Sequence, residues 1–322
     1  MGHPFPVRVS DVAGEWRATR QGSDPTRALL ALLAGDLPVP EGFRLTRALP
    51  LPDAVLAAHA DVRAIDVDQT NESVVVGDAV VVKWVTDPLR GPHPAPERLR
   101  RLAEAGFTAT PALHGIVEWR TPDGDWVPVA VVADLVRDAT DGWTWCLDEA
   151  RIALGLRPGS ARPFAGALGG LTAAMHLALA DTPAGPVADH GDLHVGQVLR
   201  TPAGDLFVID FDGNPTLPPS ERVRHRPAAY DVAGMLVSLE NVGHVVAHHD
   251  PQVAEADVVA WTGAVQAEFL DAYRATARGL LDETLLDPFM MDQIHRELAY
   301  ADSHLPRWRY VPEAALRRRG LS

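Results

Sequence analysis

The sequence predicts an α+β protein with two lobes, a small lobe rich in β-strands followed by a larger helical lobe. β-Branched residues dominate residues 62–85, where two apolar runs flank Gly77-Asp78, a dipeptide typical of tight β-hairpin turns. After Asp134 the chain changes to long Ala- and Leu-rich segments with helical spacing, interrupted once by a strand-and-loop stretch at 187–219. Strands gathered before helices in this way are the order of an α+β fold.

Composition shifts divide the chain into three parts. Residues 1–60 mix polar turns with short helical runs, and the Pro-rich segment 37–52 separates them from the strand-rich residues beyond, so we expect an N-terminal cap subdomain there. Residues 61–136 form the predicted β-rich lobe with one main helix. Residues 137–322 form the predicted helical lobe.

The remaining elements are predicted from spacing and from turn residues. The segment 96–105 has the apolar spacing of a helix, and Gly106 ends it. Residues 112–119 and 126–135 predict a second pair of strands because they are apolar and flank a turn sequence. The Gly- and Ala-rich stretch 164–180 predicts a helix packed closely within the core of the second lobe.

The charge balance limits the partners. The 322 residues include 29 Lys and Arg against 43 Asp and Glu, a formal net charge of −14. Such a chain repels nucleic acids and anionic membranes, so we expect a small neutral or cationic partner instead. The longest stretch of low polarity, 164–180, is too short and too small in side-chain volume to predict a membrane span.

The cysteine content and the first residues indicate the compartment. Cys146 is the only cysteine, which excludes an intramolecular disulfide and a cysteine zinc cluster and suits a reducing environment. Residues 1–10 lack the apolar core of a signal peptide. We therefore expect a cytoplasmic protein, and we expect it to be a monomer.

Two runs of residues carry the chemistry. The first is His190-Gly191-Asp192 and the residues up to Leu199, and the second is the apolar strand that leads into Asp210. Phosphoryl transfer needs one carboxylate to orient the attacking hydroxyl, and further oxygen ligands to hold Mg²⁺ on the phosphates of ATP. Asp192 suits the first role, whereas Gln197 and Asp210 suit the second.

Two simpler interpretations compete with this one. A single Asp in a turn is most often a helix cap or part of an Asx-turn. Asp192, Gln197 and Asp210 together, at this spacing around an apolar strand, favour a catalytic site instead. His190 and His194 stand four residues apart, as zinc ligands on a helix do. The metalloprotease motif, however, has Glu after its first His and is helical throughout, whereas Gly191 and the following strand break a helix here.

The two runs resemble the catalytic and metal loops of the aminoglycoside phosphotransferase family, within the kinase-like superfamily. The resemblance implies a bilobal protein-kinase-like fold, ATP and Mg²⁺ as cofactors, Asp192 as catalytic base, and metal ligands at Gln197 and Asp210. This chain departs from the family pattern because Gln197 stands where Asn is usual. The resemblance also implies a structural supporting role for His190.

The small lobe should then hold the nucleotide. Lys83 lies in an otherwise apolar strand, where a buried ammonium group needs an acidic partner. The resemblance supports Glu97 as that partner, with Glu104 as the alternative. In place of a glycine-rich motif, the segment 70–73, including Ser73, is expected near the phosphates. The hinge is expected to offer backbone groups of residues 133–135 to adenine, with Ala133 and Leu135 at its two ends.

The acceptor is predicted from a second resemblance. Residues 138–143 and 300–308 are similar to segments of bacterial maltokinases, which implies a sugar as the acceptor. Negative charge beside Asp192 would suit a protonated amino sugar through charge-assisted hydrogen bonds, and the chain also resembles actinobacterial glucosamine kinases, which make glucosamine 6-phosphate. We therefore predict an amino-sugar acceptor, specifically glucosamine. The candidate acceptor residues are Asp231, Glu297, Tyr300, Asp302, Trp308 and His194.

Three rival functions remain at this point. A maltokinase would make maltose 1-phosphate, and an aminoglycoside phosphotransferase would also suit an acidic pocket. A pseudokinase would bind nucleotide without catalysis, although the joint presence of Lys83, Asp192 and Asp210 argues against it. A protein kinase is disfavoured because the span from Gly213 to Asp231 contains no A-P-E segment and no room for an activation loop.

Overall fold

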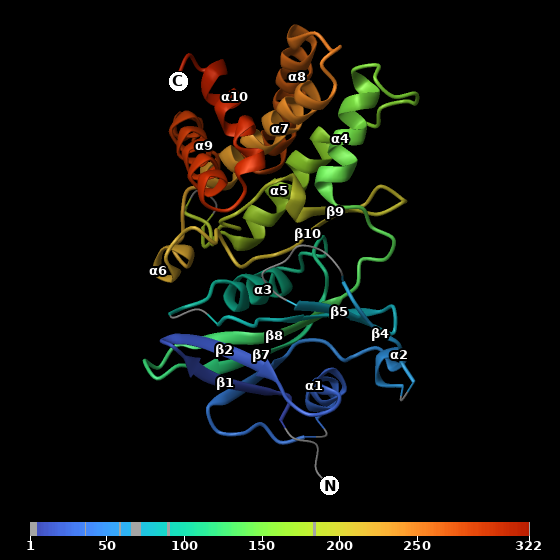
Figure 1. Ribbon diagram of the computed structural model, residues 1–322, viewed down its shortest axis with the longest axis vertical. Coiled ribbons are helices and arrows are strands. Elements are labelled where there is room, and N and C mark those ends of the chain that lie inside the picture. The colour runs from blue at the N-terminus through green and yellow to red at the C-terminus, as the bar shows by residue number, and fades with distance from the viewer. Residues whose placement is uncertain are drawn as a thin grey trace. The chain divides into compact units, whose positions relative to one another are not determined.

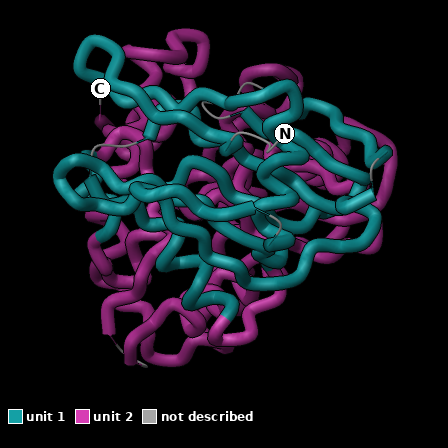
Figure 2. The backbone as a smooth tube through the Cα atoms, turned by 90° about the horizontal axis from the view of Figure 1, so that it is seen from below, with its two compact units in different colours: residues 1–103, 110–137, 218–223 teal, residues 104–109, 138–217, 224–322 magenta. Residues whose placement is uncertain are grey.

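The computed structural model of the chain describes residues 5–35, 37–57, 59–65, 72–88, 91–182 and 185–321 (Figure 1). It contains two compact units, which Figure 2 colours separately. The first comprises residues 1–103, 110–137 and 218–223, and the second comprises residues 104–109, 138–217 and 224–322. A β-sheet dominates the first unit and helices dominate the second, which confirms the predicted α+β class.

The sheet of the first unit has six antiparallel strands. In spatial order they are β3 (Phe43–Arg47), β7 (Leu113–Arg120), β8 (Trp126–Asp134), β6 (Val80–Trp84), β5 (Glu72–Val76) and β4 (Val62–Ala64). Gly77 and Asp78 connect β5 to β6 with φ values of 58° and 47°. Positive φ at both central residues is the signature of a type I′ turn, so the predicted hairpin is confirmed.

One face of this sheet carries the core of the first unit. Leu29 and Leu32 of α1 (Pro25–Ala34) pack with Val76 and Val82 of the sheet. Asp24 caps the start of α1 by accepting a hydrogen bond from the Arg27 N–H. α3 (Ala95–Glu104) lies on the opposite side of the sheet from α1 (Figure 1).

The first sixty residues contain strands that the sequence analysis did not predict. A hairpin of β1 (Val7–Val12) and β2 (Glu15–Arg20) precedes α1, and the short α2 (Asp53–Leu56) follows β3. Apolar residues alternate in both strands, at Val7 and Val9 and at Trp16 and Ala18, but two such residues in a six-residue polar run are a weak strand signal. Val7 and α1 share the core of the sheet rather than forming a separate one.

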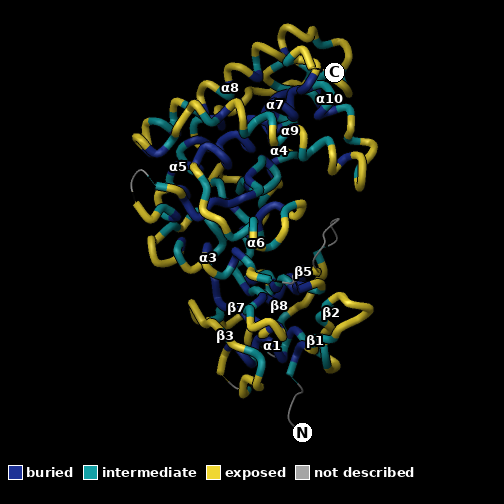
Figure 3. Tube along the Cα trace, turned by 90° about the vertical axis from the view of Figure 1, so that its left-hand side faces the viewer, coloured by how far each residue is buried: buried dark blue, intermediate teal, exposed yellow. Residues whose placement is uncertain are grey.

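The second unit is built around α7 (Ala229–His249), which is buried along most of its length (Figure 3). The other long helices are α4 (Gly142–Ala153), α5 (Ala165–Leu179), α8 (Glu255–Thr276), α9 (Leu286–Ser303) and α10 (Tyr310–Arg318). The short elements are η1 (Val195–Gln197), β9 (Val198–Arg200), β10 (Leu206–Val208), η2 (Glu283–Leu285) and η3 (Pro306–Trp308), while α6 (Pro219–Arg222) belongs to the first unit.

Helix α5 packs as closely as its small residues predict. A Cβ atom added at Gly169 would lie 2.1 Å from the carbonyl oxygen of Phe269 in α8, so only glycine allows this approach. At the other end of the unit, buried Glu240 of α7 pairs with Arg318 and Arg319 and thereby fixes the C-terminal helix. No helix among the described residues combines the length and the apolar character needed to cross a membrane.

Candidate active site

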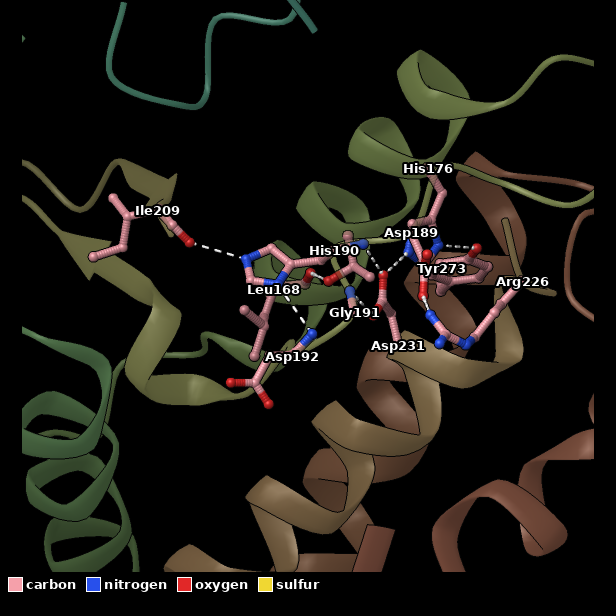
Figure 4. Close-up of polar contacts among 11 residues, drawn as sticks. Leu168, His176, Asp189, His190, Gly191, Asp192, Ile209, Arg226, Asp231 and Tyr273 are labelled. Carbon is pink, nitrogen blue, oxygen red and sulfur yellow. Dashed lines mark hydrogen bonds and ion pairs between the residues drawn. The ribbon is translucent and has the colours of Figure 1, made fainter. Parts of the chain in front are cut away.

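The first chemical run forms a loop between α5 and β9, which we call the catalytic loop (residues 189–197). Its backbone is anchored by the Asp231 carboxylate, at the start of α7, which accepts hydrogen bonds from the N–H groups of His190 at 2.6 Å and Gly191 at 2.9 Å (Figure 4). Gly191 has a φ of 81°, a conformation that side chains with a Cβ rarely adopt. This backbone geometry sets the direction in which Asp192 leaves the loop.

Two further buried side chains complete the anchor. His176 of α5 places one ring nitrogen 3.1 Å from Asp231 and the other 2.7 Å from the Tyr273 hydroxyl of α8. Burial alone would raise the pKa of the Asp231 carboxyl, but the His176 hydrogen bond, the nearby histidine charges and the Gly191 N–H hold this pKa below its ordinary value. Side chains of three helices therefore form one buried chain of hydrogen bonds, from Tyr273 through His176 to Asp231.

This arrangement corrects the expectation that Asp231 binds the acceptor. Asp231 is 1% exposed, and both of its oxygens accept hydrogen bonds from within the protein. The Asp192 carboxylate points away from it (Figure 4). Asp231 is thus a positioning residue of the catalytic loop.

His190 links the catalytic loop to the second run. Its Nε2 lies 2.9 Å from the carbonyl oxygen of Ile209, and its Nδ1 lies 3.4 Å from the Asp192 nitrogen. A neutral ring that donates from Nε2 and accepts at Nδ1 satisfies both contacts. The ring also packs against Phe211, with centroids 4.8 Å apart. His190 therefore supports the loop structurally, as the family resemblance implied.

Asp192 lies in an environment that favours a basic carboxylate. Burial raises its pKa to about 6, and the charges of Asp210 and Asp231 act in the same direction. The charge of Arg296 opposes this rise, as His190 would in its protonated form. A carboxylate whose pKa is raised in this way is a better proton acceptor than an ordinary Asp side chain and is still ionised at neutral pH.

Asn214 is the neighbour of Asp192 that the sequence analysis missed. Its side-chain nitrogen donates a hydrogen bond of 3.0 Å to Oδ1 of Asp192, and Asn214 itself is 6% exposed. Asn214 stands four residues after Asp210, so it belongs to the metal loop in sequence but contacts the catalytic loop in space. The signal that could have indicated an ordered side chain is Asn214 itself in a turn sequence, because an Asn side chain readily accepts a hydrogen bond from the N–H two residues on, as it does here from Thr216.

The candidate metal ligands come from adjacent segments. The Ile209 N–H donates 2.9 Å to the carbonyl oxygen of Gln197, which brings the residue before Asp210 beside Gln197. Asp210 has a φ of 64°, unusual for a residue other than glycine, and is exposed. An amide and a carboxylate oxygen fit Mg²⁺, which is typically held in kinases by one or two carboxylates together with phosphates and water. No group of three His, Cys, Asp or Glu side chains suited to a metal occurs among the described residues.

Helix α4 holds the turn that carries Gln197. Gly142 begins α4 so close to the turn that an added Cβ atom would lie 1.7 Å from the carbonyl oxygen of Val195. The indole nitrogen of Trp145 donates 3.2 Å to the carbonyl oxygen of Val198. The structure therefore fixes the backbone on both sides of Gln197.

Glu297 is the acidic acceptor candidate that lies near Asp192. It projects from α9 and accepts hydrogen bonds from Gln293 at 2.9 Å and from Asn241 at 2.8 Å. Burial raises the pKa of Glu297, the two hydrogen bonds lower it, and the charge of Asp192 raises it further. The effect of Asp192 on Glu297 is consistent with both carboxylates lying in the same part of the second unit.

The other acceptor candidates contact different groups. Tyr300 is 37% exposed and stacks on His304 with centroids 4.7 Å apart. Asp302 forms an ion pair with Arg309. Neither contact brings these two predicted residues beside Asp192, so their acceptor roles stay predictions.

Trp308 and His194 have structural contacts of their own. Trp308 packs against Trp143 and Tyr310, with centroids 5.9 and 6.3 Å away. The His194 Nδ1 accepts a hydrogen bond of 3.1 Å from Gly196 and so caps the turn that carries Gln197. Burial lowers the pKa of His194 to about 4, which keeps the ring neutral at neutral pH. These contacts favour supporting roles over sugar binding.

The first unit carries the predicted nucleotide residues. Lys83 pairs across the sheet with Ser73 of β5 and Val131 of β8, so Lys83 and Ser73 lie side by side on the sheet. The Glu97 carboxylate contacts Arg100 and Arg101 on its own helix, and the Lys83–Glu97 pair stays a prediction. Residues 70 and 71 of the predicted phosphate segment lie outside the described residues.

The predicted hinge is the end of β8. Ala133 pairs with β6 and β7, which places its backbone between two strands. The Leu135 N–H donates 2.8 Å to the carbonyl oxygen of Ala79. Any adenine contact at Leu135 would therefore use its carbonyl oxygen.

Comparison with known proteins decides the family. The chain is 38% identical to a glucosamine kinase of Streptacidiphilus jiangxiensis over 375 aligned positions, which cover 96% of this chain and 84% of that protein. The chain belongs to the glucosamine kinase family. A glucosamine kinase of Mycolicibacterium smegmatis is 36% identical, with 96% and 91% of the two chains covered. No protein-family model matches the sequence.

A solved structure supports the glucosamine kinase fold. A glucosamine kinase in complex with glucosamine, ADP and inorganic phosphate superposes with a TM-score of 0.77 at 31% identity, covering 99% of this chain and 94% of that one. The predicted bilobal, kinase-like fold is thereby confirmed. The family assignment also agrees with the sequence resemblance that carried the acceptor prediction.

Proposed function

We propose that this chain is an ATP-dependent glucosamine kinase that phosphorylates the sugar at its 6-hydroxyl. The supporting observation is that Asp192 on the anchored catalytic loop and Glu297 on α9 belong to one unit, where the charge of Asp192 raises the pKa of Glu297. The near full-length relationship to glucosamine kinases supports the same substrate, as does the relative that binds glucosamine, ADP and phosphate.

The proposed reaction is a direct transfer from ATP to the sugar hydroxyl. Asp192 accepts a hydrogen bond from the hydroxyl, orients its oxygen toward the γ-phosphate and takes up its proton as the new bond forms. Lys83, on the sheet beside Ser73, supplies positive charge for the phosphates. Mg²⁺, when bound by Asp210 and Gln197, would neutralise charge on the phosphate oxygens.

The proposed specificity depends on Glu297. Its half-buried carboxylate receives hydrogen bonds from two neutral amides and feels the charge of Arg296, but it has no cationic hydrogen-bond partner among the described residues. A protonated amine would supply that compensation with charge-assisted hydrogen bonds. Asp192 would then contact the reacting hydroxyl while Glu297 contacts the amino group of the same sugar.

Substrate discrimination tests this function. We expect kcat/KM for glucosamine to exceed that for N-acetylglucosamine by at least about a hundredfold, because acetylation removes the positive charge that Glu297 requires. The measurement is ADP release with ATP and Mg²⁺ across glucosamine, glucose and N-acetylglucosamine. Glu297→Gln should reduce the preference for glucosamine over glucose, whereas Glu255→Gln, which alters an exposed glutamate at the start of α8, should preserve it.

The same assay separates the rival acceptors. Maltose and kanamycin are included because the maltokinase and aminoglycoside phosphotransferase alternatives share the kinase scaffold. Preference for maltose or kanamycin would keep the kinase mechanism and reject glucosamine as the acceptor. ATP binding without turnover on any of these compounds would instead favour a nucleotide-binding pseudokinase.

The pH dependence of kcat tests the role of Asp192. The pKa of this carboxyl is raised from 3.8 to about 6, and only its ionised form accepts a proton. Activity should therefore be lost as the pH falls through about 6, by about tenfold per pH unit well below it, and should reach a plateau above. Steady-state rates at saturating substrates between pH 5 and 8 check this. A flat profile over that range would contradict the assignment of Asp192 as the base.

A further inference from the structure

Asn214 occupies a position from which it can orient the Asp192 carboxylate. Its Nδ2 donates 3.0 Å to Oδ1 of Asp192. Among the described residues, no other side chain has a hydrogen bond to that carboxylate. The contact between Asp192 and His190 involves the backbone N–H of Asp192 and is long, at 3.4 Å. Oδ2 is therefore the oxygen left to receive the acceptor hydroxyl.

The orientation of the Asn214 amide is determined by Thr216. The Oδ1 atom of Asn214 accepts hydrogen bonds from the Thr216 N–H at 2.9 Å and from the Thr216 hydroxyl at 2.6 Å. The reversed amide would direct its NH₂ group at a backbone N–H and its oxygen at a carboxylate, and both contacts are repulsive. Only the orientation that donates to Asp192 satisfies all of these groups.

The backbone around Asn214 is also held. The Leu217 N–H donates 3.1 Å to the carbonyl oxygen of Asn214, which closes a turn over residues 214–217. Since Asn214 is 6% exposed, its amide has little access to water as a substitute partner. A buried amide held by two local hydrogen bonds is a rigid donor, and rigid donors are what position a catalytic group.

We propose that Asn214, held by Thr216, is a positioning residue that fixes the Asp192 carboxylate with one oxygen directed at the acceptor hydroxyl. Asn214 follows Asp210 by four residues, so the same segment that would hold the metal also orients the base. The proposal rests on the proposed kinase activity. It assigns a role in that activity to a residue that is neither the predicted base nor a predicted metal ligand.

Electrostatics near Asp192 give the proposal a second readout. The titratable and charged groups that act on Asp192 are His190, Asp210, Asp231 and Arg296, and Glu297 is influenced by it in turn. None of these is altered by a substitution at Asn214. A donor to the ionised form of a carboxyl favours that form, so its removal should shift the acid limb of the kcat profile to higher pH.

The test uses Asn214→Ala with glucosamine and ATP. We expect kcat to fall about ten- to a hundredfold, the size expected when a hydrogen bond to a charged group is lost, while KM for ATP changes less than about threefold. In the same variant, the acid limb of the kcat–pH profile should move to higher pH. Unchanged kcat and an unchanged limb would overturn the proposal, and so would a rise in KM alone, which would indicate a substrate contact instead.

Thr216 provides the matched variants. Thr216→Val removes the hydroxyl bond to Asn214 and should lower kcat in the same direction, with little further effect when added to Asn214→Ala. Thr216→Ser retains a hydroxyl and should restore most of that loss. Fully additive effects of the two substitutions would contradict a shared role.

Two controls complete the experiment. Thr284→Val removes a threonine hydroxyl bond of the same 2.6 Å length, here to the Asp282 carboxylate at an exposed turn, and should leave kcat unchanged. Wild-type protein is measured first. An inactive wild type would refute the proposed function, whereas an active wild type equalled by Asn214→Ala would refute only the role of Asn214.

Discussion

Asp192→Asn should lower kcat by about a thousandfold or more while the protein remains folded and binds ATP. The substitution keeps the side-chain shape and an oxygen that can accept the hydrogen bond from Asn214, but it removes the negative charge that accepts the proton. Effects of this kind fall on kcat because the lost interaction develops mainly in the transition state. Steady-state turnover and equilibrium ATP binding measured on the same preparation check both halves of this prediction.

Asp205→Asn is the matched control for Asp192→Asn. Asp205 is an exposed aspartate in the turn between β9 and β10, where it accepts a hydrogen bond from Thr201, so the chemical change is identical but lies in a surface turn. Its kcat should equal that of the wild type. Turnover of Asp192→Asn within tenfold of the wild type would exclude Asp192 as the base and require another proton acceptor.

The sequence predicted the parts of the site that are contiguous in the chain. The spacing of Asp192, Gln197 and Asp210 predicts a catalytic and a metal segment, and the structure joins Gln197 to Ile209 by a backbone hydrogen bond. The contact of Asn214 with Asp192 joins residues 22 positions apart. Such a contact depends on how two loops fold against each other, and local sequence patterns do not reveal it.

Asp231 shows why charge alone was a poor guide. An acidic residue near the start of a helix can line a pocket, cap the helix or accept backbone hydrogen bonds from another segment. The local sequence looks alike in all three cases. The structure distinguishes them because His176, from another helix, contacts this carboxylate and is itself held by Tyr273 of a third helix. A partner from a distant helix is invisible to local patterns.

The elements of the fold also divide into those that local sequence signals predict and those that they do not. The hairpin at Gly77-Asp78 and helix α5 were predicted because turn chemistry and small-residue composition are local signals. The β1–β2 hairpin was missed because each strand is short and mostly polar, so its few alternating apolar residues are a weak signal. Elements that are stabilised mainly by a neighbouring surface are the ones that a sequence pattern does not reveal.

Asp231→Ala should destabilise the protein by about 3–5 kcal/mol, the range seen when one partner of a buried charged pair is removed. The substitution leaves the N–H groups of His190 and Gly191 and one nitrogen of His176 without their acceptor. Each buried group that loses its partner retains the full cost of its desolvation. The free energy of unfolding, from urea denaturation followed by circular dichroism, measures this loss.

Asp287 provides the control for Asp231. It also stands in the first turn of its helix, α9, but is exposed, so Asp287→Ala removes a carboxylate from a first helical turn without unpairing a buried donor. Its expected cost is below about 1 kcal/mol. If the two variants unfold at similar urea concentrations, the Asp231 carboxylate does not anchor the catalytic loop. If Asp231→Ala alone is destabilised, the anchor is a structural requirement for holding Asp192, because the same two N–H groups fix the backbone from which its side chain projects.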